Sequence, residues 1–99
     1  MRALPSDRAL AAVGNDLPRL PIVEVVWRDS TSSSDWSLLA EARKETLLEV
    51  RTVGRLIRCD RRIVAVVQTT NNNGKVNQNW MIPRSWVVKI TELRPRRRK

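Results

Sequence analysis

The chain contains no histidine, and this absence removes the side chain that most often acts as general base, proton shuttle or zinc ligand. The single cysteine, Cys59, cannot form an internal disulfide or a thiolate metal site, and no histidine is available to activate it as a nucleophile. The acidic residues are scattered, and no glycine-rich phosphate-binding loop occurs. We therefore expect a protein that is not an enzyme and that needs no cofactor or metal.

Long apolar runs are also missing. None approaches the ~20 residues that a membrane-spanning helix needs, and the apolar stretch at residues 9–13 is too short for a secretory signal. A single cysteine suits a reducing compartment. We expect a cytoplasmic protein that does not insert into a membrane.

Positive charge, in contrast, is abundant and unevenly placed. Nineteen Lys and Arg against ten Asp and Glu give a net charge of +9. The last six residues contribute +5 of it, through Arg94, Arg96, Arg97, Arg98 and Lys99. Such a basic tail attracts phosphates by Coulomb forces and bidentate guanidinium hydrogen bonds, whereas the alternative is a solvated end that aids solubility. Residues 94–99 are thus a candidate nucleic-acid contact.

Residues 1–21 are expected to form an N-terminal arm that three prolines interrupt. Between the prolines there is room for one short helix, with Ser6 as N-cap, Asp7 in the first turn and Gly14 at the C-terminal end. A helix of about two turns is marginal by itself, so this one needs a surface on which to dock.

Residues 22–93 alternate apolar and polar side chains over short stretches, which is typical of strands. Gly54 interrupts a long strand, and a glycine there indicates a bend that lets a sheet curl into a barrel. The sequence Asn71-Asn72-Asn73-Gly74 predicts a hairpin turn, since Asn and Gly tolerate a positive φ. The predicted strands are Ile22–Asp29, Thr46–Cys59, Ile63–Thr70, Val76–Ile82 and Trp86–Ile90.

The connections between these strands complete the predicted fold. A helix of roughly two to three turns should follow the first strand, beginning at Ser34 or Asp35 and carrying Trp36 on one edge. A tight turn is expected at residues 60–62, and a short turn or 3₁₀ step at residues 83–85. The sequence therefore predicts a mainly β fold: a small, partly open five-stranded antiparallel barrel over residues 22–93, with one short helix after the first strand.

Part of this pattern resembles a known family. Gly54-x-Leu56 followed by Asp60 and the apolar strand Ile63–Val67 resembles the first motif of Sm-like proteins, and Ile82–Ile90 is similar to the second, where a short turn precedes the closing strand. The resemblance implies an Sm-like or Src-homology-3-like barrel. The glycine-rich RNA-binding loop of the second Sm motif is missing here. A homo-oligomeric ring stays open as an alternative to a single copy.

A second resemblance covers most of residues 22–93. Trp27-x-Asp29-Ser30 with Trp36-x-x-Leu39, together with Ile82-Pro83-Arg84-Ser85 and Ile90-x-Glu92-Leu93, is similar to short uncharacterised proteins of tailed phages and prophages. It implies a phage accessory or host-interaction role, in the cytoplasm of the host cell, without naming a target.

The four tryptophans are the only aromatic residues, so each is either core or a contact surface. Trp27 lies on the apolar face of its strand and Trp36 on the predicted helix, and we expect both to pack in the core. Trp80 and Trp86 have polar neighbours, and an exposed ring at these positions would stack on a nucleic-acid base. The predicted binding surface consists of Trp80, Trp86, Arg84, Lys75 and Gln78.

These observations favour a non-catalytic, phage-type accessory protein that engages nucleic acid, DNA or RNA, through the basic tail and the Trp/Arg surface. The alternative is a protein-interaction module that binds or inhibits a host protein, or a structural component of a virion. Its contacts would be exposed β edges and the apolar side of the arm helix, with Leu4, Leu10 and Val13. Capture of a small nucleotide-like ligand is a weaker third alternative, because no pocket signature is visible.

Overall fold

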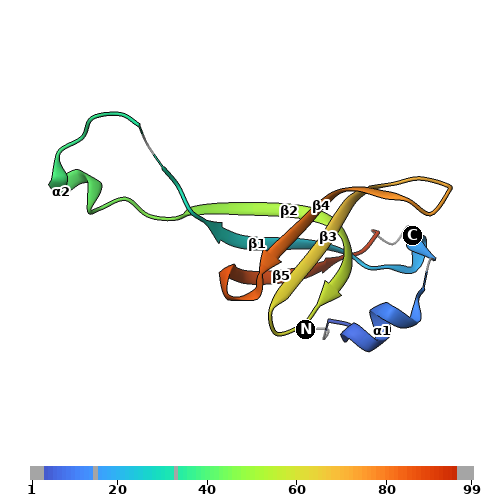
Figure 1. Ribbon diagram of the computed structural model, residues 1–99. Helices are drawn as coiled ribbons and strands as arrows, with labels where there is room; N and C mark the ends of the chain where they lie inside the picture. The colour runs from blue at the N-terminus through green and yellow to red at the C-terminus, as the bar shows by residue number, and fades with distance from the viewer. Residues whose placement is uncertain (1–3, 15, 33, 96–99) are drawn as a thin grey trace.

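Five antiparallel strands form one sheet in the order β4-β3-β2-β1-β5 (Figure 1). The computed structural model describes residues 4–14, 16–32 and 34–95. The sheet curls into a small, partly open barrel whose two edge strands are β4 and β5, and this confirms the predicted fold class. The strands are β1 Ile22–Asp29, β2 Leu48–Cys59, β3 Ile63–Thr70, β4 Val76–Pro83 and β5 Val87–Leu93.

The long strand β2 changes partner near Gly54, as the predicted bend requires. Residues 48–55 pair with β1, whereas residues 55–59 pair with β3. A Cβ atom at Gly54 would lie 2.7 Å from the backbone oxygen of Val67. Only glycine lets the two strands approach this closely, because backbone atoms cannot move aside as a flexible side chain can.

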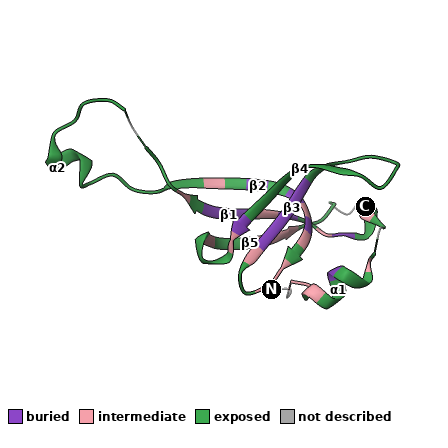
Figure 2. Ribbon diagram, viewed as in Figure 1, coloured by how far each residue is buried: buried purple, intermediate pink, exposed green. Residues whose placement is uncertain are grey.

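Most of the core comes from β1 and β3, with buried residues of β2 and one of β4 packed against them, and the buried segments of β1 and β3 lie side by side at the middle of the molecule (Figure 2). β-branched residues dominate the core, as expected for strands. One polar side chain, Thr52, is buried among them, and its Oγ1 accepts a hydrogen bond of 3.0 Å from Nε1 of Trp27. The most deeply buried side chains are Val23, Val25, Leu56, Val64, Val66, Val67 and Ile82.

The N-terminal arm docks on one end of the barrel through α1, Asp7–Ala12 (Figure 1). The predicted caps are confirmed: Oγ of Ser6 accepts a hydrogen bond from the Ala9 N–H at 3.1 Å, and Gly14 has a φ of +62° just past the helix. A 3₁₀ turn, η1 Leu17–Arg19, leads into β1. Leu10 is 4% exposed and belongs to the barrel core. Its prediction as a contact for a partner protein is therefore wrong, because the barrel itself covers it.

The connection from β1 to β2, residues 30–47, projects away from the sheet (Figure 1). It contains α2, Leu39–Ala42, which is much shorter than predicted and begins after Trp36. Trp36 is 103% exposed, so its predicted place in the core is wrong. The reason is the path of the loop, which carries Trp36 beyond any surface that could cover it.

The other two connections follow their predicted chemistry. Oδ1 of Asn71 accepts hydrogen bonds from the N–H groups of Asn73 and Lys75, and Gly74 has a φ of +77° in the β3–β4 hairpin. After β4 the chain makes one 3₁₀ turn, η2 Arg84–Trp86, and continues as β5. This 3₁₀ turn holds both Arg84 and Trp86.

Candidate functional site

Asp60 organises the turn between β2 and β3 through both of its carboxylate oxygens. Its Oδ1 accepts hydrogen bonds of 2.8 Å from the backbone N–H groups of both Arg62 and Ile63. Its Oδ2 lies 2.7 Å from Nε of Arg58. The hydrogen bond from Ile63, the bond from Arg58 and the bond from Arg62, in that order, lower the pKa of Asp60 to about 2. The carboxylate is thus ionised at neutral pH, with one oxygen directed at the backbone of the turn and the other at Arg58.

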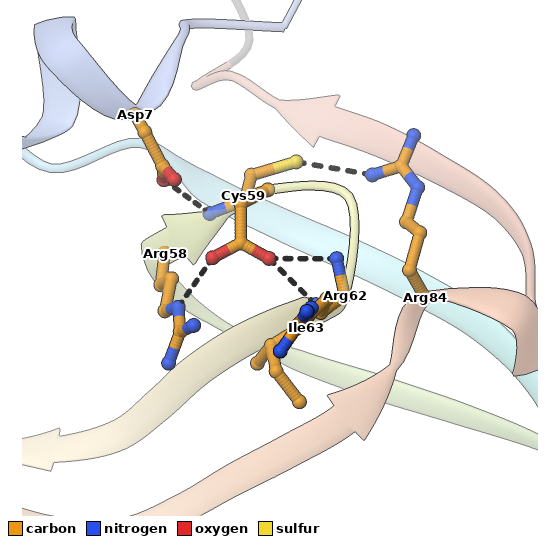
Figure 3. Close-up of polar contacts among 7 residues, drawn as sticks. Asp7, Arg58, Cys59, Arg62, Ile63 and Arg84 are labelled. Carbon is orange, nitrogen blue, oxygen red and sulfur yellow. Dashed lines mark hydrogen bonds and ion pairs between the residues drawn. The ribbon is translucent and has the colours of Figure 1, made fainter.

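Further contacts connect this turn to α1 and to η2 (Figure 3). The backbone N–H of Cys59 donates a 2.7 Å hydrogen bond to Oδ1 of Asp7 in α1. A guanidinium nitrogen of Arg84 lies 3.1 Å from Sγ of Cys59, and the Arg84 N–H donates to the Arg62 carbonyl at 2.8 Å. Cys59 is half-buried, and its sulfur contacts a cation.

Four arginines therefore gather at this end of the barrel, and we call them the basic turn: Arg58, Arg61, Arg62 and Arg84. The carboxylates among them, Asp7 and Asp60, accept hydrogen bonds from backbone N–H groups. Arg61 and Arg62 are exposed, and their guanidinium groups form no hydrogen bond or ion pair with any described residue. The basic turn thus presents unpaired positive charge to solvent.

Three tryptophans, one of them in η2, contact one another, and we call them the indole cluster: Trp27, Trp80 and Trp86. Trp27 stacks on Trp86 with ring centroids 6.4 Å apart and planes 14° apart. Trp27 also contacts Trp80, at 6.3 Å and a tilt of 57°. Trp27 is 5% exposed, whereas Trp80 and Trp86 are 41% and 42% exposed. One buried ring therefore supports two half-exposed rings.

Hydrogen bonds fix two of these rings. Besides the bond from Trp27 to Thr52, Nε1 of Trp80 donates to Oε1 of Gln68 at 3.0 Å. The Gln68 amide is itself held, because its Nε2 donates to the backbone oxygen of Val53 at 3.1 Å. For the half-exposed Trp80, the ring face rather than the N–H group is therefore what remains for further contacts.

Trp86 also lines an open hollow of about 470 Å³ at the base of the projecting loop. Arg28 and Ser85 line the same hollow. The guanidinium of Arg28 forms no hydrogen bond or ion pair within residues 4–14, 16–32 and 34–95. A cation that forms no ion pair with a described residue thus lies beside a half-exposed aromatic ring.

The residues of the predicted binding surface do not all lie together in the structure. Arg84 belongs to the basic turn, while Trp80 and Trp86 belong to the indole cluster, and η2 joins the two because it holds both Arg84 and Trp86. Lys75 is exposed at the tip of the β3–β4 hairpin. This end of the β3–β4 ladder lies away from the basic turn and from the indole cluster. Oε1 of Gln78 accepts a hydrogen bond from the Thr69 hydroxyl at 2.8 Å.

Of the predicted basic tail, Arg94 is exposed and lies 3.4 Å from a carboxylate oxygen of Glu92. The tail residues Arg96, Arg97, Arg98 and Lys99 lie outside the described residues.

Four arginines were not predicted as binding residues from the sequence. Three belong to the basic turn and one lines the hollow beside Trp86: Arg58, Arg61, Arg62 and Arg28. A signal for three of them was present, since Arg58-Cys59-Asp60-Arg61-Arg62 places cations around a predicted turn, where side chains point to solvent. No comparable signal existed for Arg28, which reaches Trp86 only through the pairing of β1 with β5.

The fold and the two groups define a small, partly open β-barrel with a cationic end and an exposed aromatic surface. No protein-family model, no curated protein and no solved structure matches the chain. The resemblances to Sm-like proteins and to short phage proteins, and the cytoplasmic location, therefore stay predictions. Among the described residues, no helix is long and apolar enough to cross a membrane.

Proposed function

We propose that this protein binds nucleic acid without catalysing a reaction on it, as a phage-type accessory protein. The observation that carries the proposal is the basic turn, where arginines from β2, from the turn and from η2 converge. Asp60 pairs with Arg58, whereas Arg61 and Arg62 have no carboxylate partner among the described residues. Guanidinium groups bind phosphate oxygens in a bidentate way. A polyanion is the partner whose charge matches this surface.

The overall charge of the chain supports the same partner. A net charge of +9 steers the protein toward polyanions before any specific contact forms. In this proposal the tail residues 94–99 add phosphate contacts to those of the basic turn. Each phosphate that a cation neutralises releases counterions, so binding should weaken steeply with salt.

A matched pair of double variants tests the basic turn. Arg61→Ala/Arg62→Ala removes two unpaired cations from the basic turn, and Arg43→Ala/Lys44→Ala removes two exposed cations from the projecting loop. Fluorescence anisotropy with a labelled mixed-sequence oligonucleotide, at about 50 and 200 mM salt, gives the salt slope. We expect the first variant to reduce the slope by about 1.4–1.8, from 0.7–0.9 per lost phosphate contact. The loop variant should change it much less.

Two outcomes would contradict the proposal. One is no binding by the wild-type protein at low salt. The other is an equal loss for the two double variants, which would mean that only total charge matters. A truncation to residues 1–93, measured in the same way, reports the separate contribution of the tail.

The projecting loop supports a second candidate function, the binding of a protein. Trp36, Leu38 and Leu39 are 103%, 70% and 66% exposed, and large apolar side chains gathered on a projection are typical of anchors for a protein partner. The same anisotropy experiment separates the two candidates, since failure of the wild-type protein to bind any nucleic acid at low salt would favour this second function.

A further inference from the structure

The indole cluster indicates which class of nucleic acid this protein binds, and this inference rests on the proposed function. Trp80 and Trp86 each expose about two fifths of their surface, although tryptophan side chains are commonly buried. Both rings are held in place by Trp27, which contacts each of them and is itself buried. Rings that are already fixed lose little conformational entropy when a planar ligand stacks on them.

The orientation of the two exposed rings restricts what can stack on them. Trp86 is nearly parallel to Trp27, with 14° between the planes, whereas Trp80 is tilted from Trp27 by 57°. The two exposed rings therefore cannot be coplanar. A rigid base pair cannot lie flat on both, but two bases of a flexible strand can each turn to meet one ring.

Phosphate contacts are available on both sides of this surface. Arg84 and Trp86 share η2, so a strand that crosses η2 passes from the basic turn to the indole cluster. On the other side, Arg28 lines the hollow that Trp86 borders. Cations flanking stacked aromatic rings are the arrangement by which proteins bind single strands without reading their sequence.

We infer that the indole cluster stacks on unpaired bases, and that the ligand of this protein is single-stranded nucleic acid rather than a duplex. In a duplex the faces of the bases are hidden by their neighbours, so the exposed rings gain nothing from it. A protein that used charge alone would have the opposite preference, because the charge density of duplex DNA exceeds that of a single strand. Preference for the single strand is therefore diagnostic of stacking.

The test compares one labelled strand of about 12 nucleotides with the same strand annealed to its complement, and with the RNA version of the strand. The variants are Trp80→Leu and Trp86→Leu, which keep an apolar side chain but remove the stacking face. Trp36→Leu is the matched control, since Trp36 lies on the projecting loop, outside the indole cluster. Trp86→Phe restores a flat ring, and thermal unfolding verifies that each variant is folded.

We expect the wild-type protein to bind the single strand, DNA or RNA, more tightly than the duplex. Trp80→Leu and Trp86→Leu should each weaken single-strand binding by about ten- to a hundredfold and leave duplex binding unchanged. Trp36→Leu should behave as wild type, and Trp86→Phe should recover much of the loss.

Equal affinity for strand and duplex, or equal behaviour of all three leucine variants, would overturn the inference. In that case a reduced salt slope for Arg61→Ala/Arg62→Ala would show that the proposed function still stands. If no nucleic acid binds at low salt, the inference and the proposed function fail together.

Discussion

The two ends of β2 have opposite surroundings. The strand is entered from the projecting loop, residues 30–47, and is left through a three-residue turn that Asp60 locks with two backbone hydrogen bonds. Near the turn, Leu56 is completely buried. The loop end of β2 is largely exposed (Figure 2). Leu47 and Leu48 there are 58% and 54% exposed.

This contrast shows that burial in a barrel of this size depends on what packs across the strand. Leu56 lies where β2 curls over β3 and where the core closes beneath it. Leu48 pairs with Asp29 at the last step of the β1–β2 ladder, beyond the reach of the core. Identical side chains on one strand thus contribute very different amounts to stability.

The largest expected effect follows from that difference. Leu56→Ala should lower the free energy of unfolding by about 2–5 kcal/mol, because it removes buried methyl groups and leaves a cavity. Leu48→Ala, the control on the same strand, should lower it by less than about 1 kcal/mol. Urea unfolding followed by circular dichroism measures both. Similar losses for the two variants would mean that the loop end of β2 is covered in solution.

Local chemistry explains why much of the fold could be predicted from the sequence. The caps at Ser6 and Gly14 and the Asn71–Gly74 hairpin each depend on residues within one turn of one another. The bend at Gly54 was predictable for a related reason, because a glycine inside an apolar strand has few other uses.

Long-range contacts explain what the sequence could not predict. The spacing of Trp36 and Leu39 fits a helix edge whether or not a surface lies beneath it, and here none does. Arg84 reaches the basic turn only because Pro83 pairs with Ile63 at the end of the β3–β4 ladder. The indole cluster likewise joins Trp27 to rings more than fifty residues away in the chain.

At the tight end of β2, Asp60→Asn should produce a pH-dependent loss of stability. The folded state lowers the pKa of Asp60 from 3.8 to about 2, so the ionised carboxylate stabilises the fold. That contribution is complete above about pH 4 and is lost as the pH falls toward about 2. The difference in melting temperature between wild type and variant should therefore be largest at neutral pH and shrink across this acid window.

The control for this prediction is Asp16→Asn, since Asp16 is exposed and lies 4.0 Å from Arg19. The difference in melting temperature between Asp16→Asn and the wild type should stay constant across the same acid range. A constant difference between wild type and Asp60→Asn at every pH would show that the amide disturbs the turn by geometry rather than by charge.

The smallest expected effect comes from removing the projecting loop. Asp29 and Leu48 are already paired, so replacing residues 30–47 with Asn-Gly would close β1 and β2 as a two-residue hairpin. Shortening the loop to two residues is about three halvings of its length, each worth about 0.6 kcal/mol of closure entropy, so the free energy of unfolding should not fall and should rise by at most about 2 kcal/mol. Thermal unfolding and single-strand anisotropy on the same preparation measure stability and binding together.

Since Arg28, Trp80 and Trp86 all remain in this variant, unchanged binding would place the nucleic-acid contact on the barrel and leave the loop with its apolar tip for a protein partner. A loss of cooperative unfolding would instead mean that the loop packs on the barrel, and the contrast between the two ends of β2 would not hold.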